Sequence, residues 1–359
     1  MSVLQTDDRR RQNNVGMSLD QLPVLGICGS SGSGKTTLIE ALIPSLLARG
    51  LQLVVLKHDA IKVQVDRPGK DSDRFFQAGA DVWVLGDLSF CRIHSAGDLH
   101  GLLRRLCLRY DLVLVEGHGT TEVPKLWLSG ETGAPPARNR GRILETLDRE
   151  QATPERVLKW IDGWLASQWR RPPVWGCVLI GGRSSRMGQP KHLIKKDGAT
   201  WVERTVWLLE KCVDQVVISG RGDLPQSLAH LPRIPDAPGL AGPLAGVLSV
   251  LRWQPAVSWL ITACDQPAIR PEALQWLLDQ RCPGTRAILP DLEQDGRVEP
   301  LLALYDFRCR PLLEELALGG SLRISMLAGV PGIVTPSPPP ALHSCWRNVN
   351  TPDELKGLS

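Results

Sequence analysis

Short runs of consecutive apolar residues alternate with longer segments in which apolar residues recur every three or four positions. In the N-terminal half, the runs at 23–28, 51–56 and 112–115 are typical of strands buried on both faces. The segments 36–49 and 99–108 have the length and spacing of helices. Strands that alternate with helices form a parallel sheet with right-handed crossovers. The pattern therefore predicts an α/β domain in the first half of the chain.

The same alternation returns in the C-terminal half. Apolar runs at 216–218 and 259–262 predict strands. Thr200 precedes a predicted helix at 201–212, and Glu203 completes a capping box with it. Both halves thus predict the same architecture, a three-layer α/β/α domain with a central sheet.

The length of the chain, 359 residues, is sufficient for two such domains. The segment 129–152 is rich in Gly, Pro and Arg, which predicts a loop region. The pair Pro172-Pro173 is expected to keep a short linker extended. The predicted organisation is a disordered tail at 1–20, a first domain at 21–168, a linker at 169–173 and a second domain at 174–359.

Charge and cysteine content exclude several classes of partner. The formal net charge of +4 is dispersed along the chain, which argues against a dedicated nucleic-acid surface. No apolar run approaches the length of a membrane span, so we expect no membrane partner. The 9 cysteines include no Cys-x-x-Cys pair, which is typical of reduced thiols, and the polar N-terminus lacks the apolar core of a secretory signal. We therefore expect a cytoplasmic protein.

A complete Gly-x-x-x-x-Gly-Lys-Thr motif at 29–36 lies between the first predicted strand and the first predicted helix. The backbone amides of such a loop surround phosphate groups at the helix N-terminus. Lys35 is expected to reach the β- and γ-phosphates, and the Thr36 hydroxyl to bind Mg²⁺. A chance Gly- and Ser-rich turn is the alternative, and the Lys-Thr pair in this context argues against it. The residues expected to bind the nucleotide are Gly29, Gly32, Gly34, Lys35, Thr36 and Thr37.

Glu116 directly follows the apolar run 112–115, at the strand end where ligands of open α/β sheets bind. In many P-loop proteins an acidic residue at this place holds the Mg²⁺ shell. Glu116 is therefore a candidate metal residue beside Thr36, with a solvated turn residue as the alternative.

These features together resemble one family of P-loop proteins, the molybdopterin-guanine dinucleotide biosynthesis adapters, which are MobB-type GTP-binding proteins. The resemblance covers residues 22–168 and rests on Gly29–Thr36, Lys57-His58, Asp66, Gly69-Lys-Asp-Ser72 and Leu114-Val-Glu-Gly117. It implies GTP binding, weak GTP hydrolysis and a homodimer that assists a partner enzyme. The implied partners are apo-molybdoenzymes and other cofactor-biosynthesis proteins. We identify no catalytic Gln or arginine finger, which agrees with weak hydrolysis.

The stretch 178–194 carries the most specific pattern in the chain. An apolar strand is followed by Gly-Gly-x-Ser-x-Arg-Met-Gly-x-x-Lys, which begins at Gly181 and ends at Lys191. Gly181 and Gly182 allow the backbone to approach a ligand closely, and Arg186 and Lys191 can neutralise phosphate charge. A tight turn with solvated basic residues is the alternative for the double glycine alone.

Acidic and amide side chains occur at later strand ends of the same domain. Asp265 directly follows an apolar strand, a position that suits a Mg²⁺ ligand over a triphosphate, with turn capping as the alternative. Asp236 ends another apolar segment, and Gly242-Pro-Leu-Ala-Gly246 begins a helix whose glycines allow close approach of a ligand. Asn348 and Asn350 can both donate and accept hydrogen bonds.

Residues 174–359 resemble the molybdenum cofactor guanylyltransferases, which are MobA-type nucleotidyltransferases. The resemblance rests on Gly181–Lys191, Asp236, Gly242–Gly246, Cys264-Asp-Gln-Pro267 and Asn348-Val-Asn-Thr-Pro352. It implies a Rossmann-like domain that transfers GMP from GTP to molybdopterin or its molybdenum form, with Mg²⁺ as cofactor and pyrophosphate as the second product. The chain is thus predicted to be a fusion of a P-loop NTPase domain with a nucleotidyltransferase domain.

The resemblance also implies roles for individual residues. Lys191, Arg186 and Asp265 would be catalytic, with Mg²⁺ on Asp265, and Asn348 and Asn350 would contact the pterin. The residues implied to bind GTP are Leu179, Ile180, Gly181, Gly182, Lys191, Asp236 and Asp265. Two positions depart from the family, which often has Asp where Pro190 stands and Asn where Ser219 stands. The departures concern base selectivity rather than the transfer chemistry.

Other functions compete with guanylyl transfer. A cytidylyltransferase acting on molybdopterin or a nucleotidyltransferase acting on a sugar phosphate would use the same chemistry with another donor. A nucleotide-gated carrier would bind the pterin and pass it on without chemistry. The presence of both Lys191 and Asp265 argues against such a carrier.

Overall fold

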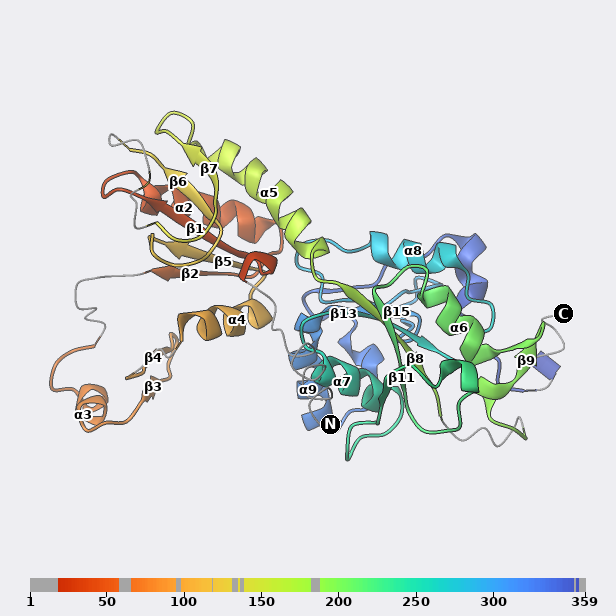
Figure 1. Ribbon diagram of the computed structural model, residues 1–359. Helices are drawn as coiled ribbons and strands as arrows, with labels where there is room; N and C mark the ends of the chain where they lie inside the picture. The colour runs from red at the N-terminus through yellow and green to blue at the C-terminus, as the bar shows by residue number, and fades with distance from the viewer. Residues whose placement is uncertain are drawn as a thin grey trace, which may run out of the picture. The chain divides into compact units, whose positions relative to one another are not determined.

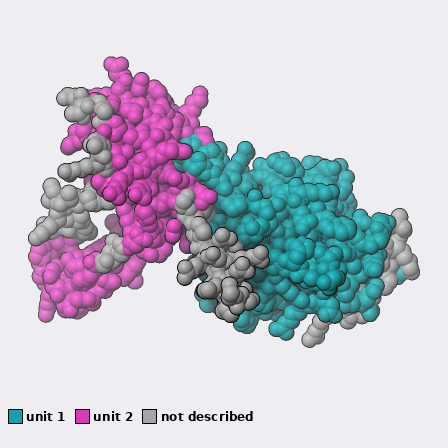
Figure 2. Space-filling view, viewed as in Figure 1, with its two compact units in different colours: residues 1–17, 164–359 teal, residues 18–163 magenta. Residues whose placement is uncertain are grey.

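The computed structural model describes residues 19–57, 66–94, 98–117, 119–130, 135, 139–181, 188–351 and 353–354. The chain divides into two compact units, residues 18–163 and residues 164–359 (Figure 2). The division falls inside helix α5 (Pro154–Arg170).

The first unit is built on a five-stranded sheet in the order β2-β5-β1-β6-β7 (Figure 1). Every neighbouring pair of strands is parallel, as the alternating pattern predicts. The strands are β1 (Val24–Gly29), β2 (Leu53–Lys57), β5 (Leu112–Glu116), β6 (Lys125–Leu128) and β7 (Ile143–Leu147). This order places β1, which leads into the Gly-rich loop, at the centre of the sheet.

Helix α2 (Lys35–Ala48) begins directly after that loop and packs against β1 and β2, and its Leu42 and Leu46 side chains are buried. Helix α4 (Leu99–Arg109) packs against β5. The Asp98 carboxylate begins α4 by accepting hydrogen bonds from the backbone N–H groups of the first turn. The sequence predicts both helices within two residues of their observed ends.

A small helix–hairpin segment lies between β2 and α4. It contains α3 (Asp71–Gln77) and an antiparallel pair formed by β3 (Val82–Val84) and β4 (Phe90–Arg92). The Arg92 guanidinium pairs with Asp66 at 3.2 Å and with Asp73 at 2.9 Å. Asp73 in turn accepts a hydrogen bond from the Gly69 N–H at 2.9 Å. The residues at the two ends of the Asp66–Asp73 segment are therefore fixed by one guanidinium.

The second unit contains a seven-stranded sheet in the order β12-β11-β8-β13-β15-β14-β16. The first four strands in this order are mutually parallel, and β15 is antiparallel to both of its neighbours. The strands are β8 (Val174–Leu179), β11 (Gln215–Ser219), β12 (Arg233–Ile234), β13 (Ser258–Ala263), β14 (Ala287–Ile288), β15 (Ala303–Tyr305) and β16 (Ile333–Val334). The carboxyl ends of four parallel strands therefore meet at one edge of the sheet.

Helices cover both faces of this sheet, as a three-layer domain requires (Figure 1). One apolar cluster joins Val178 to side chains of α6 (Trp201–Leu209) and α8 (Pro271–Asp279). A second cluster joins Cys177 to α7 (Pro243–Trp253) and α9 (Arg310–Leu318). Successive strand residues point to opposite faces, so the two clusters are the two sides of one core. The predicted capping box of Thr200 and Glu203 is present at the start of α6.

Two features differ from the sequence-based expectation. Strand β7 lies inside the segment 129–152, which was predicted to be a loop region because its Gly, Pro and Arg content conceals a short run of strand-forming residues. Helix α5 continues to Arg170, so the first two residues of the predicted linker 169–173 are helical. Trp169 is buried in the second unit, and its indole N–H donates to the Thr285 carbonyl at 3.1 Å. The boundary between the two units, at 163/164, lies five residues before the predicted end of the first domain at 168, and the predicted tail 1–20 lies almost entirely outside the described residues.

Within the described part of the chain, no helix combines the length and the apolar character that crossing a membrane requires. The 9 cysteines are all free thiols.

Candidate active site

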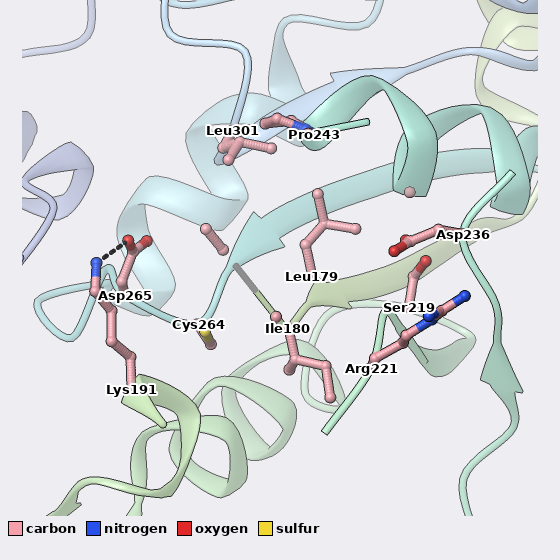
Figure 3. A pocket seen from close by; sticks show the side chains of 14 residues that line it. Leu179, Ile180, Lys191, Ser219, Arg221, Asp236, Pro243, Cys264, Asp265 and Leu301 are labelled. Atoms are coloured by element: carbon pink, nitrogen blue, oxygen red, sulfur yellow. Dashed lines mark hydrogen bonds and ion pairs between the residues drawn. The ribbon is translucent and has the colours of Figure 1, made fainter. Parts of the chain in front are cut away.

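A cavity of about 610 Å³ lies at the carboxyl ends of β12, β11, β8 and β13 in the second unit (Figure 3). The residues predicted to bind GTP in the second unit all line this cavity where the structure describes them: Leu179, Ile180, Gly181, Lys191, Asp236 and Asp265. Gly182 and Arg186 lie outside the described residues. The fold therefore brings together residues that are far apart in the sequence.

Lys191, Asp265 and Asn350 meet at one end of this cavity. The Lys191 ammonium donates to the Asp265 carboxylate at 3.0 Å and to the Asn350 side-chain carbonyl at 2.6 Å. Their ionised groups are only partly shielded, with 16% of the Lys191 side chain and 22% of the Asp265 side chain exposed. Both charges are thus available to a ligand that enters the cavity.

The backbone holds Asp265 in place. The N–H of Cys264 donates to the Leu179 carbonyl at 3.1 Å, which continues the pairing of β13 with β8 beyond the strand end. The N–H of Val349 donates to the Asp265 carbonyl at 2.9 Å. Val349 is fully buried, whereas its neighbours Asn348 and Asn350 are exposed. One buried residue therefore positions both asparagines beside the acid.

The N-terminus of α7 borders the cavity with Gly242 and Pro243. Gly242 has φ +69° and ψ −163°, a conformation that strongly favours glycine. Gly246, one turn later, lies against the strand ends: a Cβ there would approach the Leu179 Cδ2 to 2.7 Å. The sequence led us to expect glycines here because a ligand would approach the backbone closely. At Gly246 the group that approaches closely is the Leu179 side chain.

The two acids of the cavity lie on different strand ends. Asp236 follows β12 and Asp265 follows β13, three strand spacings apart, which corresponds to about 14 Å along the sheet edge. Figure 3 shows them on opposite sides of Leu179 and Ile180. They therefore do not form a shared metal site, and among the described residues no group of three or more His, Cys, Asp or Glu side chains could hold a metal ion.

Burial raises the pKa of the Cys264 thiol, which lines the cavity beside Asp265, to about 12. The adjacent Asp265 charge raises the pKa further, and the Lys191 charge opposes this change. The thiol is protonated at neutral pH, so the cavity contains no cysteine nucleophile in its reactive form.

Arg221 and Leu301 also line the cavity and were not singled out in the sequence, whereas Ser219 was noted there only as a departure from the family. Ser219 and Arg221 lie at the carboxyl end of β11, so the end of a predicted parallel strand was the signal that could have identified them. No sequence signal identifies Leu301, because neither β15 nor the segment that precedes it was predicted.

The Gly-rich loop of the first unit has the expected local structure. Gly32 and Gly34 have φ +75° and +85°, and α2 begins at Lys35, with Thr36 and Thr37 as its next residues. Gly29 ends β1. The Lys35 ammonium donates to the carbonyls of Gly29 at 3.1 Å and Ser30 at 2.6 Å, so it lies over the loop where a phosphate would bind.

Thr36 and Glu116 are in direct contact. The Thr36 hydroxyl donates to the Glu116 carboxylate at 2.6 Å, and the Lys57 ammonium lies 3.6 Å from the other carboxylate oxygen. Glu116 is almost buried, at 9% exposed. The two predicted metal residues of the first unit are therefore adjacent, and Lys57 adds a positive charge beside them.

Comparisons with known proteins agree with the division into two units. A model of the MobA-like NTP transferase domain matches residues 176–328. A model of molybdopterin guanine dinucleotide synthesis protein B matches residues 24–141. Each family model therefore falls on one of the two α/β units.

Individual relatives each match only part of the chain. A "Probable molybdenum cofactor guanylyltransferase" of Bacillus mycoides is 32% identical over 140 residues, which are 38% of this chain and 69% of the relative. A molybdopterin-guanine dinucleotide biosynthesis adapter protein of Haemophilus influenzae is 42% identical over 114 residues, which are 30% of this chain and 64% of the relative. The crystal structure of molybdopterin-guanine dinucleotide biosynthesis protein A from Archaeoglobus fulgidus is 28% identical, with a TM-score of 0.43, and covers 51% of this chain and 95% of that chain.

The fold and the two sites define a nucleotidyltransferase domain fused to a P-loop domain. The chain belongs to the molybdenum cofactor guanylyltransferase family, and its first unit is similar to the adapter proteins. The fusion predicted from the sequence motifs is thereby confirmed.

Proposed function

We propose that the second unit transfers GMP from GTP to molybdopterin or its molybdenum form and releases pyrophosphate. The observation that carries the proposal is the convergence of Lys191, Asp265 and Asn350 at one end of a cavity of about 610 Å³. This arrangement offers a cation for phosphate oxygens, a carboxylate for a metal ion and an amide for the acceptor substrate.

In this mechanism the terminal phosphate of the pterin attacks the α-phosphorus of GTP in line, and pyrophosphate leaves. Lys191 exchanges its contacts with Asp265 and Asn350 for phosphate oxygens and stabilises the charge of the transition state. Arg186 provides a second cation in the same loop, and Gly181 and Gly182 let the backbone approach the nucleotide. Positioning and charge stabilisation are sufficient, so the protonated Cys264 thiol has no part in the reaction.

Asp265 fits a Mg²⁺ ion that arrives with the nucleotide. Mg²⁺ is usually bound by one or two carboxylates together with substrate phosphates and water. A single partly exposed carboxylate, at 22% exposed, meets that requirement without a cluster of protein ligands. Bound there, Mg²⁺ would neutralise charge on the α-phosphate.

Asn348 and Asn350 are proposed to contact the pterin. Both side chains are exposed on either side of buried Val349, and Asn350 already reaches Lys191. A bound pterin phosphate would therefore lie close to the cation that stabilises the reaction. Asp236, on the opposite side of the cavity, is proposed to contact the nucleotide.

Product analysis distinguishes an enzyme that transfers GMP to the pterin from a carrier that binds the pterin without chemistry. The full chain is incubated with Mg²⁺, GTP and molybdopterin, and the products are identified by mass spectrometry. We expect the guanine dinucleotide and an equal amount of pyrophosphate. Molybdopterin recovered unchanged from the protein, without pyrophosphate, would instead support a carrier.

The first unit is proposed to bind GTP with Mg²⁺ through Gly29, Lys35 and Thr36, to hydrolyse it slowly and to assist delivery of the product. Its proposed partners are apo-molybdoenzymes and other cofactor-biosynthesis proteins, in the cytoplasm. Raised local concentration of cofactor and recipient would follow from fusing this unit to the transferase.

We predict that Glu116→Gln lowers Mg²⁺-dependent GTP hydrolysis by the first unit at least about tenfold. The amide removes the charge that holds the Thr36 hydroxyl at 2.6 Å, and it leaves Lys57 without its carboxylate. Phosphate release measures this activity separately, because the transferase reaction releases pyrophosphate. Glu40→Gln, on an exposed face of α2, is the matched control. Equal rates for both variants would remove Glu116 from the site.

A homodimer through the first unit is also proposed. The helix–hairpin segment exposes large apolar side chains, among them Trp83 at 68%, Leu85 at 78% and Leu88 at 89%. Exposed apolar groups that are close in sequence are typical of protein interfaces.

We predict that Leu88→Ser combined with Trp83→Ser converts a dimer to a monomer without loss of folding, because neither side chain is buried. Sedimentation equilibrium at micromolar concentration measures the change. Leu318→Ser, which is 88% exposed in the second unit, is the matched control. A wild-type chain that sediments as a monomer would contradict the proposed dimer.

A further inference from the structure

Arg221 lies at the far side of the transferase cavity from Lys191. It comes two residues after the end of β11 and lines the cavity. In Figure 3 its side chain extends toward Ser219 and Asp236 and away from the pair formed by Lys191 and Asp265. Its guanidinium makes no hydrogen bond or ion pair with any other residue that the structure describes. The cavity thus contains a second cation whose donors are free within the described part of the chain.

The order of the strands separates this cation from the phosphate end. β11 is two strand spacings from β13, which places the Arg221 backbone about 10 Å along the sheet edge from Asp265. If the triphosphate lies at Lys191 and Asp265, the nucleoside must extend over β8 toward β11 and β12. Arg221 and Asp236 are then the charged groups nearest to the base.

Ser219 does not provide this contact itself. Its side chain is 1% exposed, and its hydroxyl has no hydrogen-bond partner among the described residues. Gly246 of α7 covers it, since a Cβ at Gly246 would lie 3.3 Å from the Ser219 oxygen. The hydroxyl is therefore beneath the cavity wall, and Arg221 is the next side chain on the same strand end that can reach a ligand.

Guanine matches a guanidinium at this place. Its O6 and N7 atoms are adjacent acceptors, and arginine donates to both at once through two parallel N–H groups. Adenine and cytosine each carry an amino donor where guanine has O6, so the same guanidinium would meet a donor instead of an acceptor. The Asp236 carboxylate matches the N1–H and N2–H₂ donors of the Watson–Crick edge, which adjoins O6.

We propose that Arg221 selects the base of the nucleotide donor by donating two hydrogen bonds to O6 and N7 of guanine. This proposal rests on the proposed guanylyl transfer, and it adds the residue that makes the transfer specific for guanine. It also explains how Ser219 can occupy the strand end without loss of guanine selection.

The test compares GTP with 7-deaza-GTP, which has a carbon in place of N7, in wild-type and Arg221→Ala full-length chains. Pyrophosphate release with molybdopterin gives kcat/KM for each donor and is not affected by the P-loop unit. We expect the wild type to use 7-deaza-GTP about tenfold less efficiently than GTP, the effect of one lost charged hydrogen bond. In Arg221→Ala the kcat/KM values for the two donors should agree within about twofold, because the guanidinium that donates to N7 is absent.

Two further variants separate base recognition from charge and from unspecific effects. Arg221→Lys keeps the charge but not the two parallel donors, so we expect it to lose most of the discrimination against 7-deaza-GTP. Arg252→Ala, a remote arginine paired with Glu314, should retain the full tenfold discrimination. The Arg221 guanidinium makes no hydrogen bond or ion pair with a described residue, so a normal melting temperature is expected for both of its variants.

Other outcomes overturn the proposal in distinguishable ways. A uniform loss of efficiency for every donor in Arg221→Ala would place the guanidinium on phosphate or ribose. If the ratio of kcat/KM for GTP to kcat/KM for 7-deaza-GTP is the same in Arg221→Ala as in the wild type, Arg221 does not contact the base. Absence of pyrophosphate with every donor in the wild type would contradict the proposed function instead. In that event, calorimetric binding of the two nucleotides in a Lys35→Ala background, which removes binding by the P-loop, still measures the discrimination.

Discussion

Lys191→Ala is expected to lower kcat for dinucleotide formation about a thousandfold, the effect of removing one preorganised charge from a transition state. Lys191 is the described cation at the phosphate end of the cavity, where its ammonium lies 3.0 Å from Asp265 and 2.6 Å from Asn350. The substitution leaves the carboxylate without its cation. It therefore removes charge stabilisation and loosens the positions of both partners.

Steady-state pyrophosphate release with molybdopterin and GTP measures this effect. Lys195→Ala is the matched control, because Lys195 is exposed on β9 (Lys195–Lys196), a few residues beyond the site. We expect the control to retain its activity and both variants to unfold at the wild-type temperature. Turnover by Lys191→Ala within tenfold of the wild type would contradict the catalytic role of the ammonium.

Gly220→Ala is expected to lower the free energy of unfolding of the second unit by about 4 kcal/mol, the sum of backbone strain and a collision in a packed region. Gly220 has φ +110°, and a Cβ there would overlap the carbonyl oxygen of Ile180. Its N–H donates to the Ile234 carbonyl at 3.2 Å, so the residue is fixed between the ends of two other strands. The backbone has no room to move away.

Calorimetry of the full chain measures this change in the transition of the second unit, and the transition of the first unit is the internal reference. Gly198→Ala separates strain from collision. Gly198 has φ +84°, but a Cβ there would meet no atom within 4 Å. We expect this control to lose about 1 kcal/mol, the cost of a left-handed residue. Equal losses in the two variants would show that the collision with Ile180 does not occur.

The sequence predicts the local structure of the Gly-rich loop well because that structure is specified by neighbouring residues. Residues 29–37 specify the loop, the glycine conformations and the start of α2 within one continuous segment. The contact of Thr36 with Glu116 is less local, but Glu116 follows an apolar run whose neighbour in a parallel sheet is predictable. The position of Lys57 beside them depends on the order of the strands, which the sequence pattern does not specify.

The transferase cavity is only partly predictable for the same reason. Lys191 and Asn350 are 159 residues apart, and each was identified by its own motif, but their hydrogen bond depends on how the chain closes around Asp265. Arg221 carries no motif, and its place in the cavity follows from the order β12-β11-β8-β13. The roles of these residues in catalysis and binding remain predictions.

Packing between distant segments explains the elements that were missed. Among the described strands, β7 pairs with β6 alone, at the sheet edge, and its five residues are concealed by a surrounding segment rich in Gly, Pro and Arg. Trp169 was predicted to be the first residue of the short linker that ends in Pro172-Pro173. In the structure the indole is buried against Thr285, and its ring centre lies 3.8 Å from the Arg308 guanidinium. Both contacts are with distant residues, so the local sequence pattern does not predict them.

Pyrophosphate release by the purified full-length chain with Mg²⁺ and molybdopterin, compared for GTP and CTP, tests the central claim most directly. Guanylyl transfer predicts release that requires molybdopterin and proceeds at least about a hundredfold more efficiently with GTP, as expected for a site whose polar groups match one base. Release that is specific to CTP would retain the mechanism and contradict the named product. Absence of release with both nucleotides would contradict the assignment of the second unit as a transferase of molybdopterin.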